Sequence, residues 1–177
     1  MTAPPDSGAI IGALQQRAVA ALSMHHGRRG ADEQRALLFR DGHAAVIPDA
    51  LLEDRVLEPI DKIVALVLLR RASPGTEPAY LPTQTELADR VNVASRDTVS
   101  RALSNLRCQR WLTVCQRSLR AGNRCWPTAY VIHTAPLGIR DTLHLDPGYA
   151  DYVQRLAQHR HARVRRVAQR ALQQLPD

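Results

Sequence analysis

A run of short polar and basic side chains lies between Ser95 and Asn105, in the sequence SRDTVSRALSN. Guanidinium groups bind phosphate and guanine through two hydrogen bonds, and hydroxyl groups bind phosphate oxygens. These side chains can therefore bind a nucleic acid. Apolar residues recur at helical spacing in this run and directly after it, namely Val99, Ala102, Leu103 and Leu106. The segment is thus expected to be a helix with one buried face, N-capped by Ser95, whose first turns can enter the major groove of DNA.

The residues before this run predict a second, shorter helix and a tight corner. Pro82 sets a turn, and Thr83 with Glu86 has the T-x-x-E spacing of a capping box, so a helix is expected over about 84–90. Asn92 suits the corner because asparagine tolerates a positive φ. The residues expected to be buried under this helix are Leu87, Ala88 and Val91. Two short helices joined by such a corner predict a helix-turn-helix.

A β-hairpin is expected directly after these helices. Strand-forming residues occupy 111–115 and 128–132, and the turn between them is centred on Gly122. Arginines in the turn predict a wing on the phosphate backbone or in the minor groove, and a solvated hairpin tip is the alternative. Pro127 predicts that its strand pairs on one side only, as an edge strand does.

Charge and composition agree with a polyanionic partner. Lys+Arg number 24 against 17 Asp+Glu, which gives a net charge of +7 and a pI of about 10.1. Aromatic residues are only 4%, which disfavours stacking on single-stranded nucleic acid. The longest apolar run, 63–69, is far too short to span a bilayer, and no basic segment precedes the apolar residues of the N-terminus. We therefore expect a cytoplasmic protein without a membrane partner.

The rest of the chain predicts four regions: an N-terminal helix and linker (1–35), a small hairpin and short helix (36–56), a winged helix-turn-helix domain (57–134), and a connector with a basic C-terminal helix (135–177). The 36–47 hairpin is expected to turn at Asp41-Gly42, and Asp49 to cap a short helix through Leu52. A further helix begins near Pro59, and 73–82 is expected to be a loop. The residues expected to share the apolar face of this helix are Ile60, Ile63, Val64, Val67 and Leu68.

The C-terminal region is expected to contain an irregular stretch over 135–148 and one long helix over 149–175. An apolar stripe and many arginines share this helix, so packing on its own domain, pairing with a second subunit and contact with DNA are all open for it. The fold class expected for the chain is mainly α with small β-hairpins (α+β).

Enzyme and metal-site patterns are missing from the sequence. It contains no glycine-rich phosphate loop, no H-E-x-x-H and no G-x-S-x-G, so no catalytic residue, cofactor or enzymatic activity is predicted. Some of the acidic residues are expected to be helix caps or solvated side chains, namely Asp49, Glu53, Asp54, Glu58 and Asp61. The three cysteines, Cys108, Cys115 and Cys125, contain no C-x-x-C pair. Reduced thiols are therefore expected, and a zinc site with His133 or His144 is the alternative.

The motif over 97–103, DTVSRAL, resembles the recognition helix of bacterial helix-turn-helix repressors, including the lactose-repressor family. The segment 57–133 is similar to the winged-helix domains of bacterial regulators and plasmid replication initiators. Over about 36–175 the chain also resembles winged-helix proteins of integrative and conjugative elements. The resemblance implies that Arg96, Asp97 and Arg101 read bases, and that Ser95, Thr98 and Ser100 hold phosphate. Asp97 could accept a hydrogen bond from cytosine or only favour the helix N-terminus.

The function expected from the sequence is specific binding of double-stranded DNA by a homodimeric transcriptional regulator. Replication, partition or maintenance of a mobile element is one alternative, and a winged-helix protein-interaction module without DNA contact is another. The candidate DNA-binding residues are Thr83, Gln84, Thr85, Ser95, Arg96, Asp97, Thr98, Ser100, Arg101, Asn105, Arg117, Arg120, Asn123 and Arg124.

Overall fold

The computed structural model describes residues 12–13, 16, 35–39, 47–72, 79–116, 120–121, 124–125 and 128–176. Gly12, Ala13 and Gln16 are helical, and the remainder of the expected N-terminal helix lies outside this part. The expected turns at Asp41-Gly42 and Gly122 also lie outside it, as does Pro127.

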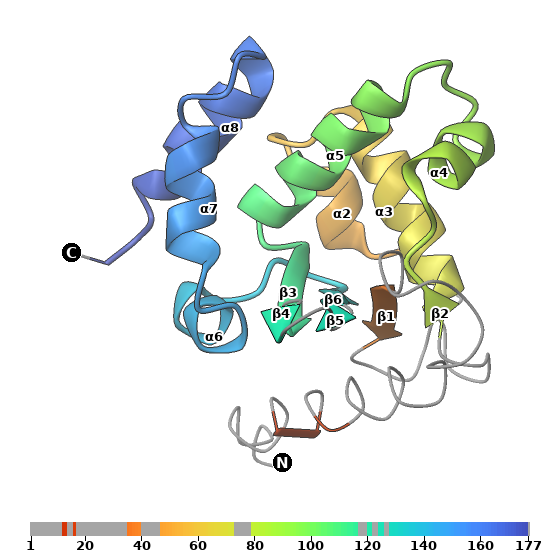
Figure 1. The fold of residues 1–177 in the computed structure, drawn as a ribbon. Helices are drawn as coiled ribbons and strands as arrows, with labels where there is room; N and C mark the ends of the chain where they lie inside the picture. The colour runs from red at the N-terminus through yellow and green to blue at the C-terminus, as the bar shows by residue number, and fades with distance from the viewer. Residues whose placement is uncertain are drawn as a thin grey trace, which may run out of the picture.

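The described chain is mainly helical and has two small sheets (Figure 1). The helices are α2 (Asp49–Glu53), α3 (Pro59–Arg71), α4 (Gln84–Arg90), α5 (Arg96–Cys108), α6 (Ile139–Leu145), α7 (Tyr149–Leu156) and α8 (Ala162–Leu172). The strands are β1 (Arg35–Phe39), β2 (Ala79–Tyr80), β3 (Leu112–Gln116), β4 (Arg120–Ala121), β5 (Arg124–Cys125) and β6 (Thr128–Ile132). The expectation of an α+β protein is therefore confirmed. No helix of this part of the chain combines the length and the apolar character needed to cross a membrane.

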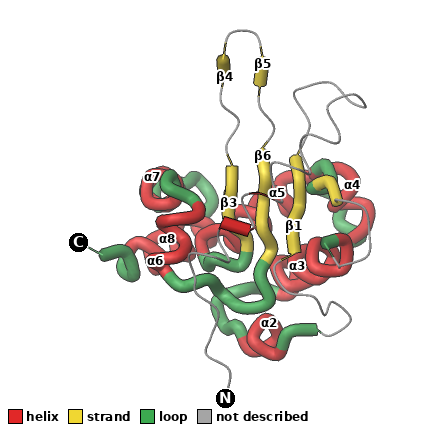
Figure 2. Tube along the Cα trace, turned by 90° about the horizontal axis from the view of Figure 1, so that it is seen from below, coloured by secondary structure: helices red, strands yellow, loops and turns green. Residues whose placement is uncertain are grey.

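The larger sheet has the strand order β2-β1-β6-β3. β6 pairs antiparallel with β3 and parallel with β1, so it is a central strand and the prediction of an edge strand was wrong. The physical reason is that the proline precedes the strand: the five residues of β6 contain no proline and keep every backbone N–H for pairing. β4 and β5 form a separate two-stranded ladder that lies beyond the ends of β3 and β6 (Figure 2).

β1 confirms the first strand of the hairpin expected over 36–47, but its partners in the described chain are β2 and β6. Ile47 lies outside any strand. β1 is thus part of the same sheet as the hairpin that follows α5. β2 is a short strand within the stretch expected to be a loop, 73–82.

The main core lies between the sheet and helices α3, α4 and α5. Val64, Leu87, Val99 and Trp111 are each 0% exposed within one apolar cluster. α3 begins at Pro59 as predicted, but Ile63 is 45% exposed although its spacing assigned it to the buried face. The buried face of α3 contains Val64, Ala65, Leu68 and Leu69, so the helix is rotated relative to the expectation.

Two acidic residues, Asp54 and Asp61, accept backbone hydrogen bonds at or just before the start of α3. Asp54 Oδ1 accepts backbone hydrogen bonds from Val56 and Leu57. Asp61 closes a capping box with Glu58 and is 1% exposed, so it is a cap as expected but not a solvated one. Asp49 does not cap α2, because Pro48 occupies the N-cap position and no side-chain cap hydrogen bond is present.

The C-terminal region differs from the sequence prediction in two places. The stretch expected to be irregular contains α6, whose Thr142 and Leu145 are buried. The single long helix expected over 149–175 is instead two helices, α7 and α8, joined by a turn at 157–161. The break has a physical reason: Gln158, His159, Arg160 and His161 are four consecutive polar residues, and a continuous helix would need an apolar residue there to stay packed.

A second apolar cluster joins α7 and α8 to the end of α5. It contains Cys108, Tyr149, Val153 and Val167, which are all buried. In Figure 1, α7 and α8 stand on one side of α5 and α3 and α4 on the other. α5 is therefore packed on two sides, and its remaining surface is the candidate site.

We expect buried thiol and phenol groups, in this second cluster and at Cys115 on β3, to make the protein sensitive to alkali. Burial raises the pKa of Cys108, Tyr149 and Tyr152 to about 12 and that of Cys115 to about 11. The folded state keeps these groups neutral, whereas the unfolded chain ionises them at ordinary values of about 9.0 and 10.0. The unfolded chain therefore binds fewer protons in this window, and stability falls as pH rises from about 9 to about 12.

Urea unfolding at pH 8, 9.5 and 10.5 measures this dependence, and the midpoint is expected to fall at each step. The variant Cys108→Ala removes one of the titrating groups, so its midpoint should fall less steeply than that of the wild type. A wild-type midpoint that stays level up to pH 10.5 would contradict the prediction.

Candidate nucleic-acid interface

α4 and the corner after it have the geometry that the sequence predicts. The Thr83 hydroxyl accepts a hydrogen bond from the Glu86 backbone at 3.2 Å, and the Glu86 carboxylate accepts one from the Thr83 backbone at 2.8 Å. Asn92 follows the helix with a φ of 55°. Leu87, Ala88 and Val91 are buried beneath α4, so the capped helix and the left-handed corner together set the direction in which the chain enters α5.

α5 begins as predicted at the N-cap Ser95, whose hydroxyl accepts a hydrogen bond from the Asp97 backbone at 3.2 Å. Val99, Ala102 and Leu106 are at most 1% exposed and confirm the buried face. Leu103 is half-buried against the same core. With its rear face fixed in this way, α5 presents the side chains of its first two turns outward.

Nine of the candidate residues lie on the exposed surface of α4 and α5 or at its edge. The exposed ones are Thr85, Ser95, Arg96 and Asp97, and the half-buried ones are Thr83, Gln84, Thr98, Ser100 and Arg101. The Arg101 guanidinium donates to the Thr98 hydroxyl at 3.0 Å, which holds it close to the helix surface. Arg96 and Arg101 are five residues apart, and exposed or half-buried hydroxyl groups flank them at Ser95, Thr98 and Ser100. This arrangement provides donors for bases and phosphates in the same region.

Asn105 does not belong to this surface, and its assignment as a DNA-binding residue was wrong. It is 2% exposed, and its side-chain amide donates to both carboxylate oxygens of Asp61 at 3.3 Å. The helical spacing placed Asn105 at the edge of the polar face. In the structure its side chain is buried because it hydrogen-bonds to the buried Asp61 carboxylate on α3. Burial of an amide is tolerated when it is hydrogen-bonded.

The C-terminal half of α5 is covered by the last part of the chain. Arg107 forms an ion pair with Asp146 at 2.6 Å, and its guanidinium stacks over the Tyr152 ring at 3.8 Å. The Tyr149 hydroxyl donates to the Cys108 carbonyl at 2.5 Å. The surface of α5 that a ligand can reach is therefore limited to about its first two turns, which begin at Ser95.

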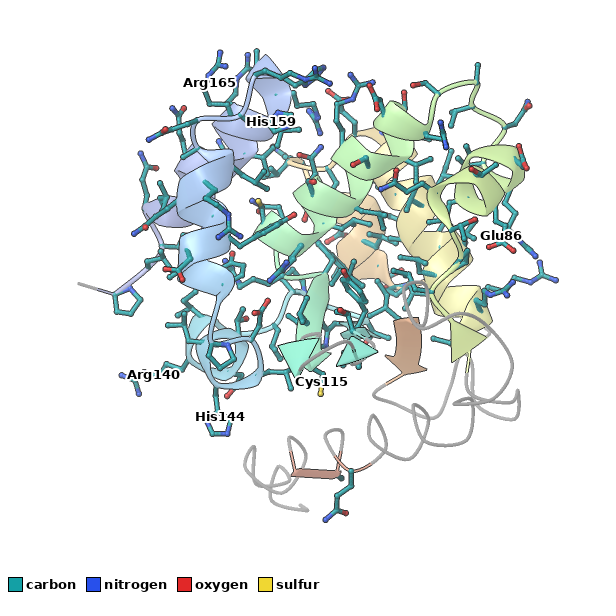
Figure 3. The ribbon with its side chains drawn as sticks, viewed as in Figure 1. Glu86, Cys115, Arg140, His144, His159 and Arg165 are labelled. Atoms are coloured by element: carbon teal, nitrogen blue, oxygen red, sulfur yellow. The ribbon has the colours of Figure 1, made fainter. Side chains whose placement is uncertain are left out.

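The turn between α7 and α8 lies beside these first turns, a feature that the sequence prediction of one long helix missed. A hollow of about 360 Å³ is lined by Asp97, Ser100, Arg101, His159, Arg160 and His161. The Arg160 guanidinium approaches the Asp97 carboxylate to 3.8 Å, and both side chains are largely exposed. Figure 3 shows His159 at the end of α7 that is farthest from α6 and its residues Arg140 and His144. The four consecutive polar residues in the apolar stripe were the signal that could have located this turn.

The expected wing is described in part. Arg120 and Arg124 lie on the paired strands β4 and β5, opposite Cys125 and Ala121 respectively. Arg117 and Asn123 lie outside the described residues. β3 and β6 confirm the antiparallel strands of the hairpin, with an irregularity in the register between Val114 and Gln116.

The residues considered for zinc have other partners or positions. His133 is buried, and its Nε2 lies 2.8 Å from the Thr113 hydroxyl. His144 is exposed on α6 (Figure 3). Cys108 is a buried thiol on α5, and Cys115 is a partly buried thiol on β3. Within the part of the chain that the structure describes, no three histidine, cysteine or acidic side chains gather as a metal site would require.

A scan against protein-family models, a search of curated proteins and a search of solved structures each found no match to the chain.

Proposed function

We propose that the protein binds double-stranded DNA in a sequence-specific manner and regulates transcription, with α5 as the helix that enters the major groove. The observation that carries the proposal is the exposure of α5: its rear face is buried and its first two turns present Arg96, Arg101 and several hydroxyls. Arginine contacts to guanine read sequence, and hydroxyl contacts to phosphate set the register.

The order of the elements supports a winged helix-turn-helix. The order α3–β2–α4–α5–β3–β4–β5–β6 places a hairpin directly after the helix that would read the bases. An arginine on each of β4 and β5 would then lie against the flanking phosphates. The net charge of +7 supplies the attraction to a polyanion and the release of counterions that accompanies binding. We further propose that two copies bind a partly palindromic site in the cytoplasm.

The test is selection of duplex DNA from a random pool at about physiological salt, followed by mobility-shift titration of the selected site. Arg96→Ala with Arg101→Ala is expected to lose the consensus, at a cost of about 1–3 kcal/mol for each base-contacting arginine. The matched control is Arg70→Ala with Arg140→Ala, which removes the same charge from exposed positions at the end of α3 and on α6. The control should keep the consensus.

Uniform binding that disappears with a modest increase in salt would contradict the proposal and favour a protein-interaction module with a merely basic surface. The symmetry of a selected consensus reports the dimer. Its position in the genome separates regulation from maintenance of a mobile element: an operator overlapping a promoter indicates the former, and an array of repeats near an origin the latter.

A further inference from the structure

We propose that residues 158–161, in the turn between α7 and α8, are a second part of the DNA interface and hold a backbone phosphate beside the bases read by α5. The inference rests on the proposed function and adds an element that the helix-turn-helix and its wing do not contain. It assigns Arg160 as the principal phosphate contact.

The position of the turn beside the exposed end of α5 supports a contact with DNA. α8 packs against α5 and α7 packs against α8, so the turn lies at the uncovered end of α5. The hollow of about 360 Å³ opens between Ser100 and Arg101 on α5 and His159, Arg160 and His161 on the turn. A DNA duplex that contacts the first turns of α5 would therefore also contact the residues that line this hollow.

The hydrogen-bond donors around the hollow also support binding of a phosphate. Arg160 is the most open of them, with 87% of its side chain exposed. The His159 Nδ1 accepts a hydrogen bond from the His161 backbone at 3.0 Å, so a neutral His159 ring carries its proton on Nε2 and can donate it. Arg101 uses one nitrogen for the Thr98 hydroxyl and keeps others for a ligand. These groups all donate hydrogen bonds, as recognition of a phosphate requires.

Among the described residues that line the hollow, Asp97 alone is acidic, and a phosphate beside it requires a nearby cation. A carboxylate on the first turn of α5 repels phosphate, and Arg160 lies 3.8 Å from it. An ion pair between two side chains as exposed as these contributes little to folding. The guanidinium is thus free to bridge the Asp97 carboxylate and a phosphate oxygen.

The turn is held in place before any ligand binds. The Arg165 guanidinium donates to the His159 carbonyl at 2.9 Å, and the His159 backbone donates to Leu156 at 3.0 Å. On α8, Arg163 bonds to the Val56 carbonyl at 2.9 Å and ties the helix to the segment before α3. A preorganised turn adds a contact without a large loss of conformational entropy on binding.

The experiment is a salt titration of DNA affinity for the full chain and for Arg160→Ala. Loss of one phosphate contact reduces the magnitude of the slope of log K against log salt by about 0.9. We expect that reduction together with a fall in affinity of about 3- to 10-fold that is equal for the selected site and for random duplexes. The consensus should not change. Arg160→Lys should recover part of the affinity, and Arg140→Ala, an exposed charge on α6, is the matched control.

A second variant separates phosphate contact from simple neutralisation of Asp97. If Arg160 only cancels that charge, Asp97→Asn with Arg160→Ala will bind DNA as tightly as Asp97→Asn alone, which would overturn the inference. The phosphate contact requires the double variant to show the lower slope and the 3- to 10-fold loss. An unchanged slope in Arg160→Ala also overturns the inference, while a retained consensus leaves the proposed function standing. The absence of any consensus in the wild type overturns the proposed function, and the slope still tests the turn.

Discussion

Replacing Arg163 by methionine is expected to destabilise the protein by about 3–5 kcal/mol, the usual cost of removing one partner from a buried ion pair. Arg163 donates to the Asp61 carboxylate at 2.9 Å and pairs with Glu58 at 2.5 Å. The Asp61 side chain is 2% exposed. Without the guanidinium, the donors to this carboxylate that remain within the described chain are the Asn105 amide and the Glu58 backbone N–H. A urea or thermal melt followed by circular dichroism measures the loss.

The matched control is Arg166→Met, an exposed arginine on the same helix, which should change stability by less than about 0.5 kcal/mol. Asp61→Asn combined with Arg163→Met removes both charges, so it should cost less than the sum of the two single changes. If Arg163→Met is as stable as the control, the buried carboxylate does not depend on this arginine and the prediction is wrong.

Trp111→Ala is expected to be as damaging, at about 3–5 kcal/mol for truncation of a buried aromatic residue. Trp111 is 0% exposed at the junction of α5 and β3, and its indole N–H donates to the Asp54 Oδ2 at 2.9 Å. Truncation opens a cavity in the main core and leaves that carboxylate oxygen without its donor. Chemical unfolding measured by circular dichroism is suitable, because a fluorescence signal would lose one of the two tryptophans.

Trp111→Phe separates the two contributions. It keeps most of the buried ring and loses the hydrogen bond, so a loss of about 1–3 kcal/mol is expected. A loss equal to that of the alanine variant would assign the whole effect to the bond with Asp54, and no loss would assign it to packing. If the free energy of unfolding of Trp111→Ala lies within about 1 kcal/mol of the wild-type value, the prediction is wrong and Trp111 contributes little to core stability.

Arg163 and Trp111 both have partners in distant parts of the chain. Asp61 and Arg163 are 102 positions apart, and Trp111 and Asp54 are 57 apart. Neither pairing follows from any local pattern. The sequence indicated caps or solvated side chains for both acidic residues, and the structure shows that caps can also be buried partners of a remote cation or indole.

The local features of the candidate site were predicted from the sequence. The starts of α4 and α5 are specified by capping hydrogen bonds of Thr83 with Glu86 and of Ser95, which span two or three residues. The corner between the helices is specified by the positive φ of Asn92. The apolar spacing of Val99, Ala102 and Leu106 then determines which face of α5 is buried. Capping and helical periodicity act over a few residues, so they can be recognised without knowing the rest of the fold.

Long-range packing controls how much of the α5 surface is exposed and which residues lie next to it. The packing of α7 and α8 covers Arg107 and brings Arg160 to Asp97, and pairing with Asp61 buries Asn105. Because β1 pairs with β6, the strand β6 is central in the sheet although it was predicted to be an edge strand. These outcomes depend on contacts between residues far apart in the chain, where burial and charge pairing outweigh the local preferences. Local sequence patterns therefore specify the capped helices and their polar and apolar faces, whereas contacts between distant residues select the part of the polar face that forms the candidate site.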